Sequence, residues 1–253
     1  MQYKQIYRIV FILGFYLIAQ GQGPNSTQPA LTATEIYEKY LAATGGMEAR
    51  KSLQSLVIEG VCTFESNQVS HPIAYYTYSY KAPLSDALSV EMLGHGISWT
   101  GHRNGEPFRR TTIGGQSLIS GIDTTIGEQD LYSFLEWNFS SGYSQMDLIG
   151  TTRIDGKQAY AVKFTGNQQQ DPVIRYYDTE TFLVLRADLI QRIRVSADDP
   201  GTSSIIETYF SNYHDYGQLK LPQIIAFHVA QRNLLFKVNK VKIDPKISDS
   251  AFH

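Results

Sequence analysis

Hydrophobic and polar residues alternate in short runs through most of the chain, and the stretch from Ile154 to Val229 shows the pattern most clearly. In residues 157–164 the bulky side chains fall on one side of an extended segment: Tyr160, Val162 and Phe164. Alternation with a period of two is typical of a strand that buries one face. The Asp155-Gly156 pair before it suits a two-residue turn, because both residues tolerate a positive φ. The pattern therefore predicts a hairpin closed at this pair.

Residues 183–194 predict a further strand with two unlike faces. The inward face is expected to carry Leu183, Leu185, Ala187 and Leu189, and the outward face Arg186, Asp188, Arg192 and Arg194. Leu185→Asp would then bury an unpaired charge and destabilise the fold by several kcal/mol. Arg186→Ala is expected to be nearly silent, because an outward side chain lies in solvent.

Runs of this kind recur along the chain and amount to about eleven strands. Turn residues separate them, including Asn104-Gly105 and Asp215-Tyr216-Gly217. Sequential strands with short links pair in an antiparallel meander. A sheet of that size with one apolar face must curl or be covered. The predicted fold class is therefore mainly β (α+β), with one large curved antiparallel sheet covered by helices.

Two segments carry helix signals instead. Thr32 and Glu35 have the spacing of a capping box, in which each side chain bonds the other residue's backbone N–H. The helix that they begin is expected to break at Gly45-Gly46 and to be followed by a short helix over Met47–Leu53. A further helix is predicted from about Glu128 to Asn138. These pieces are the expected cover of the sheet.

The N-terminus has the features of a secretory signal. Residues 1–21 combine the basic Lys4 and Arg8, an apolar run over Ile9–Ile18, and the small-x-small sequence Ala19-Gln20-Gly21. The apolar run is shorter than the roughly 20 residues of a membrane span, so a cleaved signal peptide is favoured over an uncleaved anchor. Residues 22–31 are then a flexible leader and 32–253 a single domain. We expect export as a soluble periplasmic or secreted protein.

The single cysteine and the charge narrow the function classes. Cys62 is the only cysteine, so an intramolecular disulfide is excluded, and it lies far from the expected signal peptide. It alternates with Ile58 and Phe64, which favours buried packing over a reactive thiol. Removal of the expected signal peptide, with Lys4 and Arg8, changes the formal charge from −2 to −4. The chain therefore has no basic surplus for nucleic acid or anionic lipid.

Patterns that carry catalysis or bind cofactors do not emerge. The six histidines are scattered and none lies in an HExxH or HxxEH context, so hydrogen-bonded or exposed histidines are favoured over a metal site. There is no GxSxG sequence. Gly114-Gly115 lacks the lysine and the helix of a phosphate loop. The acids and bases look like a solvated surface, and the sequence predicts no enzyme, no metal and no cofactor.

Several segments carry a family resemblance: Tyr40–Gly46, Leu56–Gly60, Ile154–Tyr160, Tyr177–Leu185 and Glu207–Tyr213, with Gly217 and Lys220-Leu221-Pro222 behind the last. On these segments the chain resembles the LolA-like family of exported proteins, in particular chains described as outer-membrane lipoprotein-sorting-like. The resemblance implies an incomplete (half) antiparallel β-barrel, lidded by helices, that holds acyl chains or another apolar ligand. Two departures are the lack of a lipobox cysteine and the wealth of tyrosine, with 17 in the chain. The first separates the chain from membrane-anchored acceptors, and the second leaves open a different hydrophobic ligand.

The alternation also selects residues for the wall of a ligand site. The candidate ligand-lining residues are Leu56, Ile58, Tyr76, Tyr78, Tyr80, Trp99, Leu183 and Leu185. The alternative is that these residues are simply core. Whether the apolar interior is a cavity or a filled core decides between the functions.

The leading hypothesis is a soluble periplasmic carrier or chaperone of the cell envelope, active as a monomer, that shields a hydrophobic small molecule, a lipid or a lipidated protein. The alternative is a non-enzymatic interaction or sensor module with a filled core, which would bind another envelope protein through an exposed face or the Gly-rich stretch Thr112–Gly127. A third hypothesis, an envelope hydrolase, would require a cleft with clustered acids. The sequence does not show such a cluster.

Overall fold

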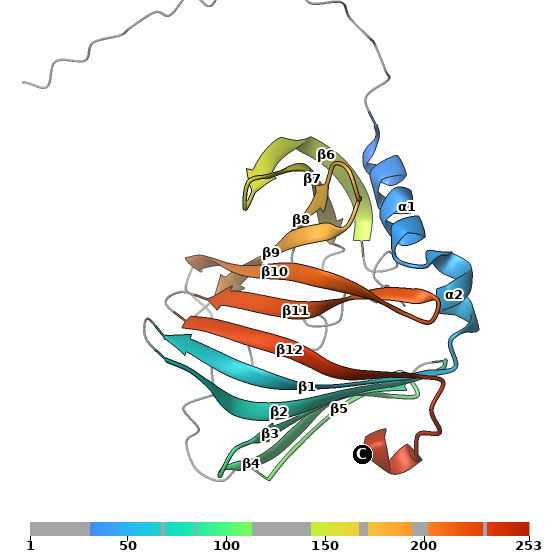
Figure 1. Cartoon of the computed structure of the whole chain (residues 1–253), viewed down its shortest axis with the longest axis vertical. Coiled ribbons are helices and arrows are strands. Elements are labelled where there is room, and N and C mark those ends of the chain that lie inside the picture. The colour runs from blue at the N-terminus through green and yellow to red at the C-terminus, as the bar shows by residue number, and fades with distance from the viewer. Residues whose placement is uncertain are drawn as a thin grey trace, which may run out of the picture. The chain divides into compact units, whose positions relative to one another are not determined.

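The computed structural model describes residues 31–66, 69–83, 85–112, 143–166, 172–193, 202–229 and 232–252. Strands dominate this part of the chain (Figure 1). They are β1 (Ser55–Ser66), β2 (Val69–Lys81), β3 (Ser85–Met92), β4 (Gly96–Arg103), β5 (Glu106–Thr111), β6 (Tyr143–Ile154), β7 (Lys157–Gly166), β8 (Val173–Asp178), β9 (Val184–Ile193), β10 (Thr202–Tyr216), β11 (Leu219–Val229) and β12 (Arg232–Ile243). The expected signal peptide, the leader and the helix predicted over 128–138 lie outside the described residues.

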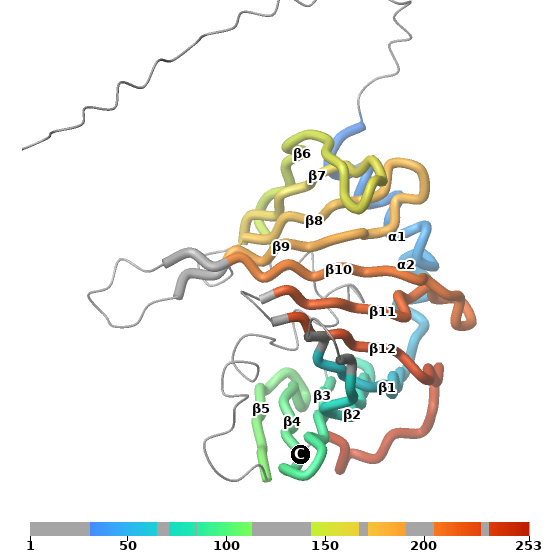
Figure 2. The backbone as a smooth tube through the Cα atoms, turned by 60° about the vertical axis from the view of Figure 1, so that its left-hand side comes forward, coloured from blue at the N-terminus to red at the C-terminus, as the bar shows by residue number. Residues whose placement is uncertain are grey.

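All these strands belong to one antiparallel sheet. Its order is β5-β4-β3-β2-β1-β12-β11-β10-β9-β8-β7-β6, which Figure 2 follows from the green strands to the yellow ones. Neighbours in the sheet are neighbours in the sequence, except that β1 pairs with β12. The sheet is open, with β5 and β6 at its edges. The predicted antiparallel meander is confirmed, with twelve strands where about eleven were expected.

The hairpin turns form at the pairs that the sequence selects. Asp155 and Gly156 have φ values of 48° and 82°, and Asn104 and Gly105 have 52° and 85°. Positive φ at both central residues gives the turn whose twist matches that of paired strands. The β6–β7 and β4–β5 hairpins are thereby held in register, from Ile154 opposite Lys157 and from Arg103 opposite Glu106.

The two faces of the sheet differ. We call inner the face that bears Ile58, Tyr78 and Leu88, which lie opposite one another on β1, β2 and β3. The same face carries Phe227 and Leu234 on β11 and β12, and Phe164 on β7. These side chains are buried and belong to a single hydrophobic cluster that runs through the sheet. The opposite face is called outer below.

Two helices precede the sheet in the described part of the chain, α1 (Ala33–Ala43) and α2 (Gly46–Ser52). The predicted capping box is present: Glu35 N–H donates to Thr32 Oγ1 at 3.2 Å, and Thr32 N–H donates to Glu35 Oε2 at 2.7 Å. The helices separate at Gly45, whose φ of 113° is left-handed. A Cβ at Gly45 would collide with the Gln218 carbonyl, so glycine is needed for this close approach to the start of β11.

Helix α1 lies on the inner face near one end of the sheet (Figure 1). The Tyr37 ring meets Phe164 with centroids 6.0 Å apart, and Tyr40 meets Tyr177 at 5.5 Å, both edge to face. The predicted helical cover is therefore present over β7 and β8. Much of the remaining inner face lies away from α1 and α2, so the cover by the described helices is smaller than expected.

The last described residues pack against the sheet. A 3₁₀ turn, η3 (Asp249–Phe252), contacts β3 and β4, and Phe252 is only 2% exposed. Lys81 Nζ pairs with Asp249 Oδ1 at 2.5 Å. The buried aromatic ring outweighs the polarity of its neighbours, because its burial contributes about 2–3 kcal/mol.

Candidate functional site: the inner face of the sheet

Most of the predicted ligand-lining residues lie together at the inner face. Leu56 lies opposite Tyr80, Ile58 opposite Tyr78, and Gly60 opposite Tyr76. All five bulky side chains are buried. A Cβ at Gly60 would collide with the Tyr76 ring and with the Lys237 carbonyl, so the glycine leaves the space in which this ring lies. The β1–β2 pair thus offers a stripe of tyrosine and aliphatic side chains.

Trp99, predicted for the same wall, lies on the other face. Leu88 is inner and pairs with Thr100, so the next residue back, Trp99, points outward. Its ring is half-buried, with the Arg110 guanidinium carbon 5.1 Å from the centroid. The inner side of β4 carries the polar residues Ser98 and Thr100, so the alternation in this strand was assigned to the wrong face. This prediction is corrected.

Leu183 and Leu185 are also displaced from their expected places. Tyr176 pairs with Arg186, but the next residue, Tyr177, pairs with Val184, so Leu185 is an extra residue in a β-bulge. Val184 is buried in the hydrophobic cluster, whereas Leu183 and Leu185 are half-buried and outside it. A bulge changes the facing of the strand by one residue. Ala187 and Leu189 do face inward as predicted.

The middle of the inner face is filled by aromatic rings. Phe236 meets Tyr76 at 5.3 Å and Phe227 at 5.5 Å between centroids. Cys62, beside them, is buried, and burial raises the pKa of its thiol to about 12, in line with the packing role expected from the sequence. A half-open pocket of about 110 Å³ lies at the edge strand, lined by Tyr143, Ser144, Gln145, Met146 and Phe164.

Charged side chains also occur on the inner face, which the sequence did not indicate. Arg175 faces inward from β8 and is 2% exposed. Towards the other edge, His102 Nδ1 lies 3.0 Å from Asp86 Oδ1. Burial raises the pKa of Asp86, and the nearby His102 opposes that rise. Arg175 pairs with Val162 across the sheet, and the run VIRYYD alone does not show which of its alternating faces is the inner one.

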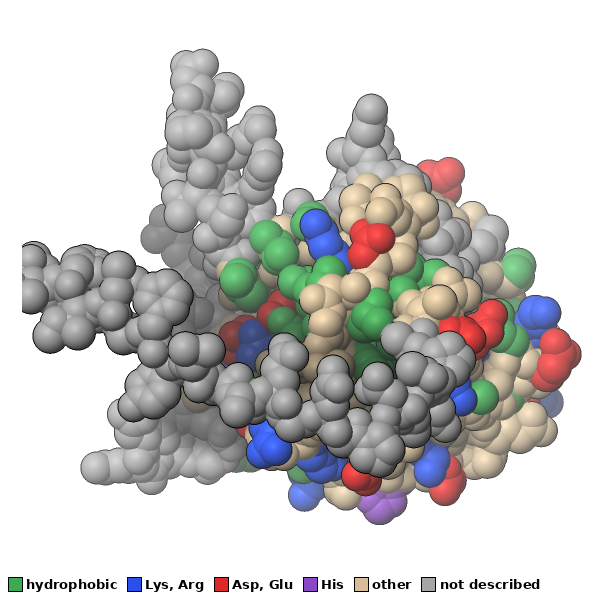
Figure 3. All heavy atoms as spheres, turned by 90° about the horizontal axis from the view of Figure 1, so that it is seen from above, with side chains coloured by type: hydrophobic (Ala, Val, Ile, Leu, Met, Phe, Trp, Pro, Cys, Tyr) green, Lys and Arg blue, Asp and Glu red, His purple; other side chains and the backbone are tan. Residues whose placement is uncertain are grey.

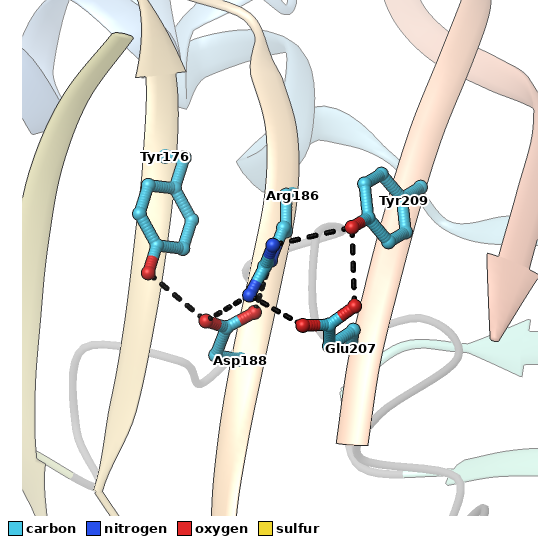
Figure 4. A network of polar contacts seen from close by, with 5 residues as sticks. All are labelled: Tyr176, Arg186, Asp188, Glu207 and Tyr209. Carbon is cyan, nitrogen blue, oxygen red and sulfur yellow. Dashed lines mark hydrogen bonds and ion pairs between the residues drawn. The ribbon is translucent and has the colours of Figure 1, made fainter. Parts of the chain in front are cut away.

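The outer face carries a compact polar network on β8, β9 and β10 (Figure 4). Arg186 binds Asp188 through two nitrogens, at 2.5 and 2.7 Å, and Glu207 at 2.7 Å. Tyr176 donates to Asp188 at 2.9 Å and Tyr209 to Glu207 at 3.1 Å. The guanidinium also lies over both tyrosine rings, with its carbon 5.2 and 5.4 Å from their centroids. These outward charges are paired and partly buried.

The prediction that the acids and bases form a solvated surface is wrong for these residues, because several of them are buried. Asp188 is 4% exposed, and Asp178, Arg50 and Arg175 are also buried. Burial raises the pKa of Tyr176 to about 12, helped by its hydrogen bond to the Asp188 carboxylate. Arg186→Ala, expected to be silent, would leave two carboxylates without their cation. The correct facing of Arg186 was predicted, but its neighbours on β8 and β10 could not be read from one strand.

Metal ligands do not gather in the part of the chain that the structure describes: no three His, Cys, Asp or Glu side chains there are placed to hold an ion. Among the same residues, no helix is both long and apolar enough to cross a bilayer.

Comparison with known proteins shows which known fold this sheet resembles. No family model matches the chain, and no curated protein matches it in sequence. Solved structures, in contrast, match it in fold. A LolA superfamily protein from Nitrosomonas europaea superposes with a TM-score of 0.57 and 14% identity, over 88% of this chain and 98% of that one. The chain has a LolA-like fold.

Two further structures share the LolA-like fold with it. A putative outer membrane lipoprotein-sorting protein domain from Vibrio parahaemolyticus gives a TM-score of 0.55 at 11% identity, over 86% of this chain and 94% of that one. A DUF1329 family protein from Desulfovibrio piger gives 0.54 at 13%, over 87% and 97%. The resemblance predicted from the sequence is confirmed at the level of the fold. The open sheet with edge strands β5 and β6 corresponds to the incomplete barrel that the resemblance implied.

Proposed function

We propose that this LolA-like chain is a carrier or chaperone of the cell envelope that shields the apolar part of a lipid or of a lipidated protein. The observation that carries the proposal is the continuous hydrophobic cluster on one face of an open sheet, from β1–β3 to β7–β12. An acyl chain laid on such a surface gains about 0.8 kcal/mol per buried methylene group. A closed barrel would hide the same surface from a bulky ligand.

Export to the envelope is part of the proposal. The basic and apolar segments of residues 1–21 support it, as does the similarity of the fold to a putative lipoprotein-sorting domain. A carrier needs no catalytic group, and the apolar inner wall supplies the binding energy by itself. The ligand-lining residues proposed are those of the β1–β2 stripe: Leu56, Ile58, Tyr76, Tyr78 and Tyr80.

Native mass spectrometry tests this function. The full chain, exported through its own signal peptide in a Gram-negative host and purified from the periplasm, should carry additional masses of lipids that solvent extraction recovers. After delipidation it should take up a long-chain acyl probe again. A protein that is always free of lipid and takes up no acyl probe would contradict the proposal.

An interaction module with a filled core is the second candidate. The ring contacts of Phe236 with Tyr76 and Phe227 favour it, because they fill the middle of the inner face with the protein's own side chains. Cross-linking in the envelope separates the two. One dominant protein partner with no lipid signal would favour the module, whereas bound lipid would favour the carrier.

A further inference from the structure

The inner face changes from apolar to polar within three neighbouring strands. On β2 it carries Tyr78, and Leu88 lies opposite this residue on β3. The next position in the same row, on β4, is Thr100, which is half-buried. The inner positions on either side of it are also polar, namely Ser98 and His102. The apolar wall therefore ends at these three residues of β4, which we call the polar margin.

A carboxylate holds the imidazole ring of the polar margin in place. Asp86 on β3 lies opposite His102, and His102 Nδ1 is 3.0 Å from Asp86 Oδ1. Because a carboxylate only accepts, this bond places the ring proton on Nδ1, and Nε2 of the neutral ring is then an acceptor. Among the residues that the structure describes, none forms a hydrogen bond with Nε2. The side chains of His102 and Asp86 are 37% and 23% exposed, so a ligand can reach them.

Two charges of opposite sign flank the polar margin. One is the Asp86 carboxylate, and the other is Arg109 on β5, which lies opposite Thr100 and is exposed. A charged head group would be attracted by one of them and repelled by the other. A neutral group with O–H bonds can donate to His102 Nε2 and accept from the Thr100 hydroxyl at the same time. The polar margin therefore suits hydroxyl groups better than a carboxylate, a phosphate or an ammonium group.

The opposite end of the sheet has no such margin and is more apolar. Five strand spacings, about 24 Å, separate β4 from β11, and the inner face between them carries the hydrophobic cluster. At the β6 edge the half-open pocket is lined in part by Tyr143, Met146 and Phe164, and Ile149 is 53% exposed. Figure 3, which looks onto the end of the molecule where β6 and β7 lie in Figure 1, shows hydrophobic side chains at the surface among charged ones. An amphiphile on the inner face therefore has one favoured direction, with its polar end at β4.

We propose that His102 and Thr100 bind the hydroxyl groups of a neutral head group, and that the chain of this amphiphile runs across the strands from β4 towards β11. The hydroxyl groups belong to a glycerol or a sugar. Asp86 is a positioning residue, because it acts through the tautomer of His102. The inference rests on the proposed function and narrows its ligand from any apolar molecule to a neutral amphiphile with a hydroxyl-bearing head group.

Displacement of an uncharged fluorescent probe tests the inference. The delipidated full chain is loaded with N-phenyl-1-naphthylamine at pH 8, and 1-monolauroylglycerol and methyl laurate, which share one acyl chain, compete for it. The glycerol ester should bind about tenfold more tightly, which is the size expected of two neutral hydrogen bonds. Dodecyl maltoside and dodecyl methyl ether make the same comparison for a sugar, and the pair with the larger difference identifies the source of the hydroxyl groups. Dodecanoate and dodecylamine, with charged head groups, should bind less tightly than the better hydroxyl-bearing ligand.

Variants of the histidine then locate the head group. His102→Asn keeps a donor for Asp86 but lacks an acceptor in the place of Nε2, so it should weaken the glycerol ester about tenfold and leave methyl laurate unchanged. His102→Gln, whose longer side chain can place its carbonyl oxygen near the position of Nε2, should keep part of the preference. His95→Asn, at an exposed position between β3 and β4, is the control and should change neither affinity. In Asp86→Asn the ring proton should move in part from Nδ1 to Nε2, which the ¹⁵N chemical shifts of His102 report, and the preference should fall with it.

The outcomes separate the inference from the carrier function. If the wild type binds each hydroxyl-bearing ligand no more tightly than its partner without hydroxyl groups, the inference is overturned and the carrier function stands. Tightest binding of dodecanoate or dodecylamine would also overturn it, as would an unchanged preference in His102→Asn. Unchanged ¹⁵N shifts in Asp86→Asn would overturn the positioning role of Asp86. A wild type that binds neither the probe nor any of these ligands would overturn the carrier function itself.

Discussion

Two arginines on adjacent strands show how differently the two faces of the sheet treat the same side chain. Arg186, on the outer face, is bound by Asp188 and Glu207 and stacked between two tyrosine rings. Arg175, on the inner face, is more deeply buried, and its guanidinium carbon lies 5.7 Å from the centroid of the Phe164 ring. The first arrangement ties β8, β9 and β10 together. The second places a charge on the surface proposed to meet the ligand.

The same contrast holds for tyrosines within β2. Tyr78 is buried on the inner face, and Tyr75 is 51% exposed on the outer face. Along one strand, a ring that supports the fold and a ring that lies in solvent are therefore only three positions apart. The difference teaches that the aromatic wealth of the chain has two roles, and that only the inner rings belong to the candidate site.

The largest effect is expected where the inner face is truncated. Tyr78→Ala should lower the free energy of unfolding by about 3–5 kcal/mol, because it removes a buried ring and leaves a cavity. Tyr75→Ala, the matched change on the outer face, should stay within about 0.5 kcal/mol. Urea denaturation of both variants checks this. Similar losses at the two positions would refute the assignment of faces.

The outer network should give the next largest effect. Arg186→Ala should destabilise the fold by about 2–4 kcal/mol, because two carboxylates lose a shared cation in a partly buried site. Arg153→Ala, at an exposed position on β6, is the control and should be nearly silent. A double-mutant cycle with Glu207→Gln should show coupling between the two changes. Strict additivity would mean that the pair contributes nothing.

Lowering the pH should reveal a third and smaller contribution to the free energy of unfolding, made by Asp178 at the turn between β8 and β9. Burial raises the pKa of Asp178, but hydrogen bonds from the Thr181 and Glu180 backbone N–H groups more than offset this, so its pKa lies below the usual value. The resulting stability is present above the ordinary aspartate pKa and is lost as the pH falls through the lowered value. Urea midpoints measured from pH 6 down to pH 3 should fall less steeply in Asp178→Asn. Parallel pH profiles of variant and wild type would contradict this.

The smallest effect concerns the helix that lies on the inner face. Thr32→Ala removes the capping box of α1 and should cost about 1 kcal/mol, since the bonds are solvent-exposed. Thr32→Ser keeps the hydroxyl and should retain most of the stability. Thermal unfolding followed by circular dichroism is sufficient. An unchanged midpoint in Thr32→Ala would show that the buried side chains of α1, and not its cap, hold the helix in place.

Alternation and turn chemistry accounted for the local parts of the fold. The hairpins at Asp155-Gly156 and Asn104-Gly105, the capping box at Thr32 and the break at Gly45 all follow from residues that are close in sequence. The β1–β2 stripe was found for the same reason. The predictions that were wrong concern features that depend on how neighbouring strands pair. The bulge at Leu185 is visible only from its partner strand, and alternation within β4 does not show which of its two faces is the inner one, so Trp99 was assigned to the wrong face.

The polar residues illustrate the same limit. Arg186 was placed on the correct face, but the partners that bury it come from β8 and β10. The burial of Arg175 could not be predicted, because an isolated charge in a short strand carries no sign of burial until the sheet is assembled. Phe252 lay in a segment without periodicity, and its burial follows from the contact of η3 with β3 and β4. The sequence pattern predicts the individual strands and helices, whereas the candidate site depends on how these elements pack against one another.

Photo-cross-linking is the most direct test of the inner face as the ligand site. A diazirine-bearing fatty acid would be bound to the full chain and irradiated, and the labelled residues would be mapped by peptide mass spectrometry. The label is expected on inner-face positions such as Tyr76, Tyr78 and Phe227, and excess unlabelled fatty acid should remove it. Saturable labelling confined to the outer face, or labelling that does not saturate, would contradict the account.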